Sequence, residues 1–130
     1  MNKFLLFNEL LRKSNRCFEK KEYINALKYI NQAIFLNLTL SNQKIRELYE
    51  LRGNIKIQMN QYLDSIGDFN KAISLDPKNP SLYFYRGFAL CVLDDKEGAL
   101  KDFNKLIEFE PDNKSAIEIS RYLKGSIGNK

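Results

Sequence analysis

Residues 46–79 are RELYELRGNIKIQMNQYLDSIGDFNKAISLDPKN, and residues 80–113, which follow directly, are PSLYFYRGFALCVLDDKEGALKDFNKLIEFEPDN. The two stretches have the same length of 34 residues and share eleven identical positions. The identical pairs are Leu48/Leu82, Tyr49/Tyr83, Arg52/Arg86, Gly53/Gly87, Asp68/Asp102, Phe69/Phe103, Asn70/Asn104, Lys71/Lys105, Ile73/Ile107, Pro77/Pro111 and Asn79/Asn113. Self-similarity at a fixed period of this length is typical of proteins built from stacked repeats.

Apolar residues recur at three- and four-residue spacing along most of the chain, which predicts helices with one buried face. The spacing and the turn signals place these helices at about residues 3–20, 23–38, 43–59, 62–75, 80–93, 96–109 and 114–123. They predict one domain over residues 1–130, with hairpins at about 7–40, 46–79 and 80–113 and a capping helix at about 114–124. Residues 125–130 are expected to be frayed, because Gly125 and Gly128 end the last helix.

Two glycines occupy equivalent places inside predicted helices. Gly53 and Gly87 lie 34 residues apart, where each glycine costs about 1 kcal/mol relative to alanine. We expect that cost to be tolerated twice because a neighbouring helix passes too close for a Cβ atom.

Arginine and aspartate also recur with the period. Arg52 and Arg86 are each followed sixteen residues later by an aspartate, Asp68 and Asp102. We expect one structural ion pair in each of these hairpins, although independent surface charges would give the same spacing. In the first hairpin both partners are replaced together, by Lys13 and Tyr29.

Composition argues against catalysis and against bound cofactors. The 130 residues include no histidine, the commonest general base and a frequent metal ligand. Cys17 and Cys91 are far apart and form no C-x-x-C pair, so we expect half-buried thiols in a reducing compartment. No Gly-rich phosphate loop occurs. We therefore expect no enzyme activity, no cofactor, no metal and no small-molecule substrate.

Charge and hydropathy limit the kinds of partner. The net charge is +5, and residues 1–40 carry seven Lys or Arg against three Asp or Glu. The basic residues are diluted along helices that also carry acids, so nucleic-acid binding is not favoured. No apolar run is long enough for a signal peptide or a membrane span, and a cytoplasmic location is expected.

The 34-residue helix–turn–helix pattern resembles the tetratricopeptide repeat. The residues that carry the resemblance are Tyr83, Gly87, Ala99, Phe103, Leu106 and Pro111 in one repeat and Tyr49, Gly53, Ser65, Phe69, Ala72 and Pro77 in the other. The first hairpin keeps Tyr23, Ala26 and Ala33 but has Ser14 and Leu38 where the family has glycine and proline. The resemblance implies an all-α solenoid of antiparallel hairpins in a right-handed superhelix.

One step of the predicted stack is too long for the period. Ala33 and Ala72 are thirty-nine residues apart, which places about five extra residues in or beside residues 39–43. These residues lengthen the second helix of the first hairpin or form a loop, and the sequence leaves both open.

In the tetratricopeptide family the first helix of each hairpin lines a groove that holds peptides or helices of partner proteins. Carried to this chain, the resemblance implies ten groove residues: Leu11, Asn15, Phe18, Glu50, Leu51, Asn54, Phe84, Tyr85, Phe88 and Tyr122. Three aromatics at residues 84, 85 and 88 are hard to cover in a small solenoid and indicate an interaction surface. Alternatively, the last helix folds over them, with Ile119 and Tyr122 in contact.

Some members of the family grip a C-terminal carboxylate of heat-shock chaperones with lysine, asparagine and arginine side chains. The corresponding residues in this chain are Leu11, Asn15, Leu51, Ser81 and Tyr85. Only Asn15 fits, and the charge-assisted donors are missing, so we do not expect this grip.

Three functions remain open from the sequence. The first is a protein–protein interaction module, an adaptor or scaffold that holds a partner's peptide or helix in the groove. The second is a structural or self-associating protein that uses the same aromatics or the N-terminal residues Phe4, Leu5 and Phe7. The third, less favoured, is a basic surface for RNA or anionic lipid formed by Arg12, Lys13, Arg16, Lys20 and Lys21.

Overall fold

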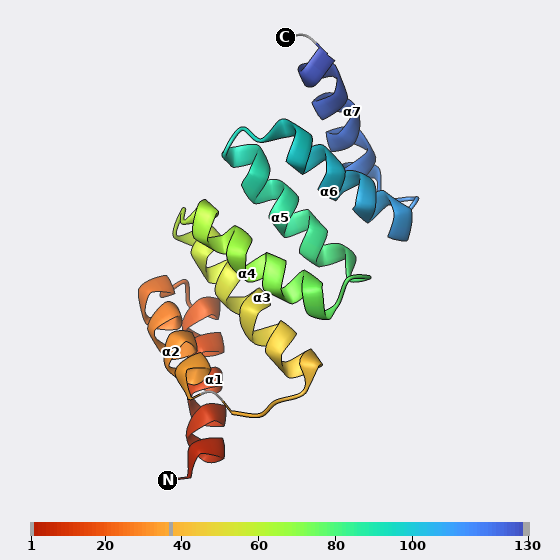
Figure 1. The fold of residues 1–130 in the computed structure, drawn as a ribbon. Helices are drawn as coiled ribbons and strands as arrows, with labels where there is room; N and C mark the ends of the chain where they lie inside the picture. The colour runs from red at the N-terminus through yellow and green to blue at the C-terminus, as the bar shows by residue number, and fades with distance from the viewer. Residues whose placement is uncertain (1, 37, 129–130) are drawn as a thin grey trace.

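The computed structural model describes residues 2–36 and 38–128, and in this part of the chain it contains helices and no strands (Figure 1). The helices are α1 (Lys3–Glu19), α2 (Tyr23–Phe35), α3 (Asn42–Gln58), α4 (Tyr62–Leu75), α5 (Pro80–Val92), α6 (Lys96–Phe109) and α7 (Lys114–Gly128). Figure 1 shows the hairpins α1–α2, α3–α4 and α5–α6 following one another, with α7 at the end opposite the N-terminus. The predicted all-α solenoid is confirmed.

The turn inside each hairpin has one shared geometry. Lys21, Asn60 and Asp94 occupy equivalent positions and have φ values of 63°, 61° and 63°. In each turn the next residue donates its backbone N–H to a carbonyl five residues earlier, as Glu22 does to Cys17 at 2.8 Å. This left-handed ending satisfies carbonyls at the helix C-terminus and turns the chain back on itself.

The buried residues form three clusters along the stack, and each cluster includes residues from the next hairpin or from α7. Leu48 and Ile55 of α3 belong to the first cluster, and Leu82 of α5 belongs to the second. Ala116 and Leu123 of α7 belong to the third. α3, α5 and α7 therefore each bury one side against the preceding hairpin, as expected for a solenoid in which only neighbours touch.

The two mid-helix glycines lie against aromatic rings of their own hairpins. A Cβ atom on Gly53 would lie 2.8 Å from Cζ of Phe69, and one on Gly87 would lie 2.9 Å from Cε2 of Phe103. The predicted steric reason for these glycines is confirmed. In the first hairpin the equivalent residue, Ser14, is fully buried, and its hydroxyl donates to the Ala26 carbonyl at 2.8 Å.

The predicted ion pairs are present in both hairpins. Arg52 Nη2 lies 2.7 Å from Asp68 Oδ1, and Arg86 Nη2 lies 2.7 Å from Asp102 Oδ1. Each aspartate is almost fully buried, and hydrogen bonding to Asp102 raises the pKa of Arg86.

The same arginines also connect neighbouring hairpins. Arg52 donates to Asn31 Oδ1 of α2 at 3.1 Å, and Arg86 donates to Asn70 Oδ1 of α4 at 2.9 Å. Ser120 of α7 continues the series by donating to Asn104 of α6 at 2.9 Å.

Two predicted helix ends are wrong. α2 ends at Phe35 rather than near Leu38, because Leu38 and Leu40 pack against the first core cluster and the extra residues form a loop. α7 continues to Gly128 rather than ending near residue 124. Its last turn is held by Ser126, whose hydroxyl accepts a 2.7 Å hydrogen bond from Lys96 Nζ of α6. The expectation for residues 129 and 130 lies outside the described residues.

Candidate functional site

The ten groove residues lie on the first helix of each hairpin and on α7, and we call the surface that they form the groove face. Three lie on α1 (Leu11, Asn15, Phe18), three on α3 (Glu50, Leu51, Asn54), three on α5 (Phe84, Tyr85, Phe88) and one on α7 (Tyr122). The residues on α1 and α3 are mixed, with three polar and three apolar side chains, whereas those on α5 and α7 are all aromatic.

The α1 end of the groove face is hollow and polar. Leu11 and Asn15 line this hollow together with Arg12, Arg16 and other polar residues of α1. The Asn15 side-chain amide donates a hydrogen bond to the Leu11 carbonyl of the same helix at 3.1 Å. Arg12 binds Glu9 at 2.6 Å, and this hydrogen bond lowers the pKa of the Glu9 carboxyl. Part of the positive charge predicted for this surface is thus paired, because Arg12 and, at 3.9 Å, Lys13 share the Glu9 carboxylate.

Phe18 is more a core residue than a groove residue. Its ring packs edge-on against Tyr23 of α2, with 5.8 Å between ring centroids. The side chain is half-buried at the margin of the first core cluster. It therefore offers a partner only part of its surface.

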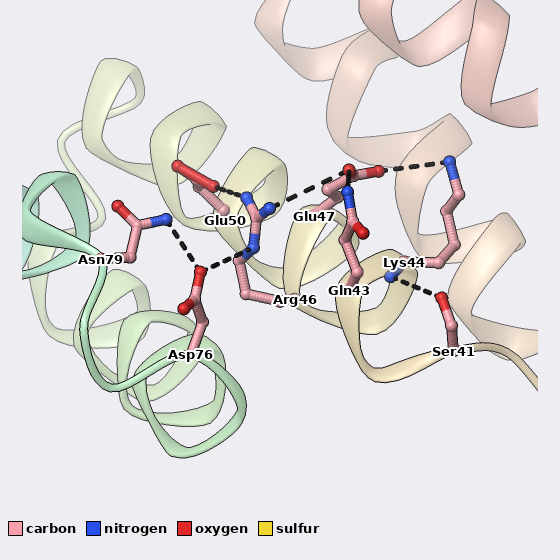
Figure 2. A network of polar contacts seen from close by, with 8 residues as sticks. All are labelled: Ser41, Gln43, Lys44, Arg46, Glu47, Glu50, Asp76 and Asn79. Carbon is pink, nitrogen blue, oxygen red and sulfur yellow. Dashed lines mark hydrogen bonds and ion pairs between the residues drawn. The ribbon is translucent and has the colours of Figure 1, made fainter.

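The α3 part of the groove face is dominated by one arginine that sequence reasoning missed. Figure 2 shows Arg46 between Glu50, Glu47 and Asp76, with separations of 2.5, 3.9 and 3.5 Å between charged atoms. Asp76 also accepts from Asn79, which caps α5. The four-residue spacing of Arg46 and Glu50 could have signalled this pair. Glu50 is therefore charge-neutralised rather than free to attract a partner's cation.

The aromatics of α5 are covered to different degrees. Tyr85 stacks on Phe69 of α4 with 5.6 Å between centroids, and Phe84 packs edge-on against Phe103 of α6 at 5.9 Å. Both side chains are half-buried. Phe88 touches Tyr62 of α4 at its edge, yet it remains 41% exposed.

α7 leaves its own aromatic residue uncovered. Tyr122 is 73% exposed. The alternative prediction, in which Tyr122 covers the α5 aromatics, therefore does not describe this side chain. Instead Tyr122, Ile119 and Cys91 line an open hollow between α5 and α7. Val92, one turn after Phe88, adds a further exposed apolar side chain.

Two of these α5 residues were not identified from the sequence. Cys91 and Val92 follow Phe88 by three and four residues, the spacing that places side chains on one side of a helix. Burial raises the pKa of the Cys91 thiol, so at neutral pH it behaves as a small apolar group.

Within residues 2–36 and 38–128 no group of three or more His, Cys, Asp or Glu side chains could hold a metal ion. In the same ranges no helix is both long and apolar enough to cross a membrane.

Comparison with protein families identifies the repeat. Residues 53–91 match the family model described as TPR repeat, and no curated protein sequence matches the chain. The Arabidopsis OM64 TPR domain has a similar structure, with 24% sequence identity, a TM-score of 0.80 and coverage of 96% of this chain and 99% of that one. This chain has the tetratricopeptide-repeat fold.

Two further tetratricopeptide structures are similar over almost their whole length, and both are complexes. The second TPR domain of human RPAP3, in complex with the HSP70 peptide SGPTIEEVD, has 21% identity, a TM-score of 0.77 and coverage of 95% of this chain and 98% of that one. The TPR2B-domain:pHsp70 complex of yeast Sti1 has 19% identity, a TM-score of 0.74 and coverage of 97% and 99%.

Proposed function

We propose that this protein is a non-catalytic interaction module of the cytoplasm, an adaptor or scaffold that binds a peptide or short helix of a partner protein on its groove face. The observation that carries the proposal is the exposure of three apolar side chains, Phe88 and Val92 one turn apart on α5 and Tyr122 on α7. Exposed apolar patches of this kind, rimmed by polar residues, mark interaction surfaces on soluble proteins.

The relatives support the same use of the fold. The RPAP3 domain and yeast Sti1 domain named above are bound to HSP70 ligands. The lysine, asparagine and arginine donors that the family uses to grip a terminal carboxylate are, except at Asn15, replaced here by Leu11, Leu51, Ser81 and Tyr85. The partner segment is therefore held mainly by apolar contacts, and it does not need to end in a free carboxylate.

A selection from random peptides tests this proposal. A phage library of 12-residue peptides is selected on the full chain, and the dissociation constants of enriched peptides are measured by fluorescence anisotropy. The Phe88→Ala/Tyr122→Ala variant should bind these peptides at least about tenfold more weakly, since aromatic anchors contribute most of the energy at such surfaces.

The matched control replaces apolar residues that are at least as exposed but lie on the second helices of the hairpins. Ile24 on α2 and Leu63 on α4 are 76% and 73% exposed, and Ile24→Ala/Leu63→Ala should leave the affinity unchanged. An absence of enriched peptides, or an equal loss with the control variant, contradicts the proposal.

Self-association is a second candidate, favoured by an apolar surface at the other end of the stack. Phe4 on α1 and Phe35 on α2 are 61% and 88% exposed, and an apolar hollow lined by Leu6, Leu10 and Leu36 extends to Phe35. Phe7, expected from the sequence to be part of this surface, is instead buried in the first core cluster, because it faces α2.

Light scattering over a hundredfold range of concentration distinguishes this candidate. A mass that rises with concentration in the wild type and stays monomeric in Phe4→Ser/Phe35→Ser supports it. A constant monomer mass for the wild type removes it.

A further inference from the structure

Resting on the proposed function, we propose that the α5–α7 end of the groove face selects a partner segment with a large apolar side chain next to a lysine or arginine. The apolar side chain occupies the hollow between α5 and α7, and the cation pairs with carboxylates at its rim.

The hollow has room for a large apolar side chain together with neighbouring parts of a partner segment, and its lining is largely apolar. It has a volume of about 520 Å³ and is lined on its apolar sides by Cys91, Ile119, Tyr122 and Leu123. Leu123 is buried in the core and forms the floor, whereas Tyr122 is largely exposed and forms a wall. Since the Cys91 thiol stays protonated at neutral pH, it adds no charge to this lining.

The rim of the hollow carries excess negative charge. Asp94, in the α5–α6 turn, and Glu118, on α7, both line it. The one cation among its lining residues, Lys96, donates to Ser126 at 2.7 Å and lies 4.0 Å from Asp94. Glu118 forms no ion pair with any residue that the structure describes.

The rest of the groove face does not offer the same charge. On α3 the two glutamates are each paired, Glu47 with Lys44 at 3.2 Å and Glu50 with Arg46. At the α1 end the hollow carries charges of both signs: Arg12 is paired with Glu9, and both Arg16 and Glu19 line the hollow. A partner's cation next to an apolar anchor is therefore matched better by the α7 end than by the α3 or α1 parts of the groove face.

The test starts from an enriched peptide of the selection described above. Two synthetic versions are compared, identical in their apolar residues and carrying either lysines or glutamates beside them. The lysine version should bind about fivefold more tightly, a difference expected for two exposed charge pairs. In Glu118→Gln/Asp94→Asn this preference should fall below about twofold.

Two controls locate the effect. Asp64→Asn/Asp112→Asn changes the net charge equally at exposed carboxylates on α4 and in the α6–α7 turn and should keep the full preference. In a Cys17→Ala background, where Cys91 is the remaining thiol, the bound lysine peptide should slow alkylation of Cys91 by iodoacetamide at pH 8.5.

The outcomes separate this inference from the proposed function. Peptides that bind without a lysine preference, or whose preference survives Glu118→Gln/Asp94→Asn, overturn the inference and leave the interaction module standing. Peptides that bind while Cys91 stays unprotected do the same. A selection that enriches no peptide overturns both.

Discussion

Gly53 and Gly87 show how a single missing methyl group sets the distance between two helices. Alanine at residue 87 would gain about 1 kcal/mol in helix propensity. Its Cβ atom would lie 2.9 Å from the Phe103 ring and 3.2 Å from Asp102 Cβ, both held in the core. Overpacking of this kind costs about 1–3 kcal/mol. We therefore expect Gly87→Ala to lower the free energy of unfolding, measured by urea denaturation, despite the better helix former.

The chain contains its own control for this prediction. Gly67 lies inside α4, and a Cβ atom added to it would meet no neighbouring side chain or helix within 4 Å. Gly67→Ala should therefore raise the free energy of unfolding by about 0.5–1 kcal/mol. A Gly87→Ala protein as stable as Gly67→Ala would show that the Phe103 ring moves aside freely.

At the scale of the helical hairpin, one arginine joins three elements. Arg86 of α5 binds Asp102 of α6 and Asn70 of α4, and its guanidinium lies 5.7 Å from the centre of the Tyr83 ring. Because Asp102 is only 3% exposed, Arg86→Ala leaves an unpaired charge in a buried site. We expect a loss of about 3–5 kcal/mol in the free energy of unfolding, measured by urea denaturation.

An exposed pair on the same hairpin provides the comparison. Lys105 Nζ and Glu108 Oε2 are 3.2 Å apart at the surface of α6, and Glu108→Ala should cost less than about 1 kcal/mol. Equal losses for Arg86→Ala and Glu108→Ala would mean that Asp102 is rehydrated when its partner is removed.

These pairs were predictable because the repeat supplies an internal comparison. Arg52–Asp68 and Arg86–Asp102 recur together, and their joint replacement in the first hairpin by Lys13 and Tyr29 indicates that the two positions touch. The structure places Lys13 Nζ 5.6 Å from the centre of the Tyr29 ring, so a cation–π contact replaces the ion pair.

Contacts that do not recur were missed. The Arg46 network joins α3 to the α4–α5 joint, and no equivalent arginine exists at Pro80, the corresponding residue of the next repeat. The end of α7 was also predicted wrongly. The hydrogen bond between Lys96 and Ser126 joins residues thirty positions apart, and the local sequence patterns that predict helix ends do not include such contacts. The partial burial of Tyr85 and Phe84 was not predictable from residue spacing, because it comes from packing of their rings against Phe69 and Phe103 of other helices.

At the scale of the whole molecule, the outer side of α1 carries charged residues at positions that are buried in the later first helices. Glu9 and Arg16 of α1 occupy the positions at which α3 buries Leu48 and Ile55 against the first hairpin. Burying Arg16, or Glu9 together with its partner Arg12, against another element would carry a desolvation cost.

At the C-terminal end of the stack, α7 covers the last hairpin. Arg121 of α7 stands where α5 has Gly87, whose lack of a Cβ admits the Phe103 ring. Arginine is much larger than the glycines at residues 53 and 87 and the serine at residue 14, beside which the return helices of the three hairpins pack. α7 covers the apolar side of α6 and presents a charged outer side, which is the role of a capping helix in a solenoid.

Removing this cap should destabilise the stack. Truncation after Asn113 uncovers the cluster that contains Phe103 and Leu106, and it should cost more than Leu123→Ala, which alone removes about 2–5 kcal/mol. Urea denaturation measures the loss, and increased binding of the dye ANS reports the uncovered apolar surface.

Truncation after Lys124 keeps the buried residues of α7 and loses the Lys96–Ser126 hydrogen bond, so it should cost only about 0.5–1.5 kcal/mol. If truncation after Asn113 costs no more than truncation after Lys124, α7 does not act as a cap, and the hollow proposed between α5 and α7 loses the rigid wall on which its selectivity depends.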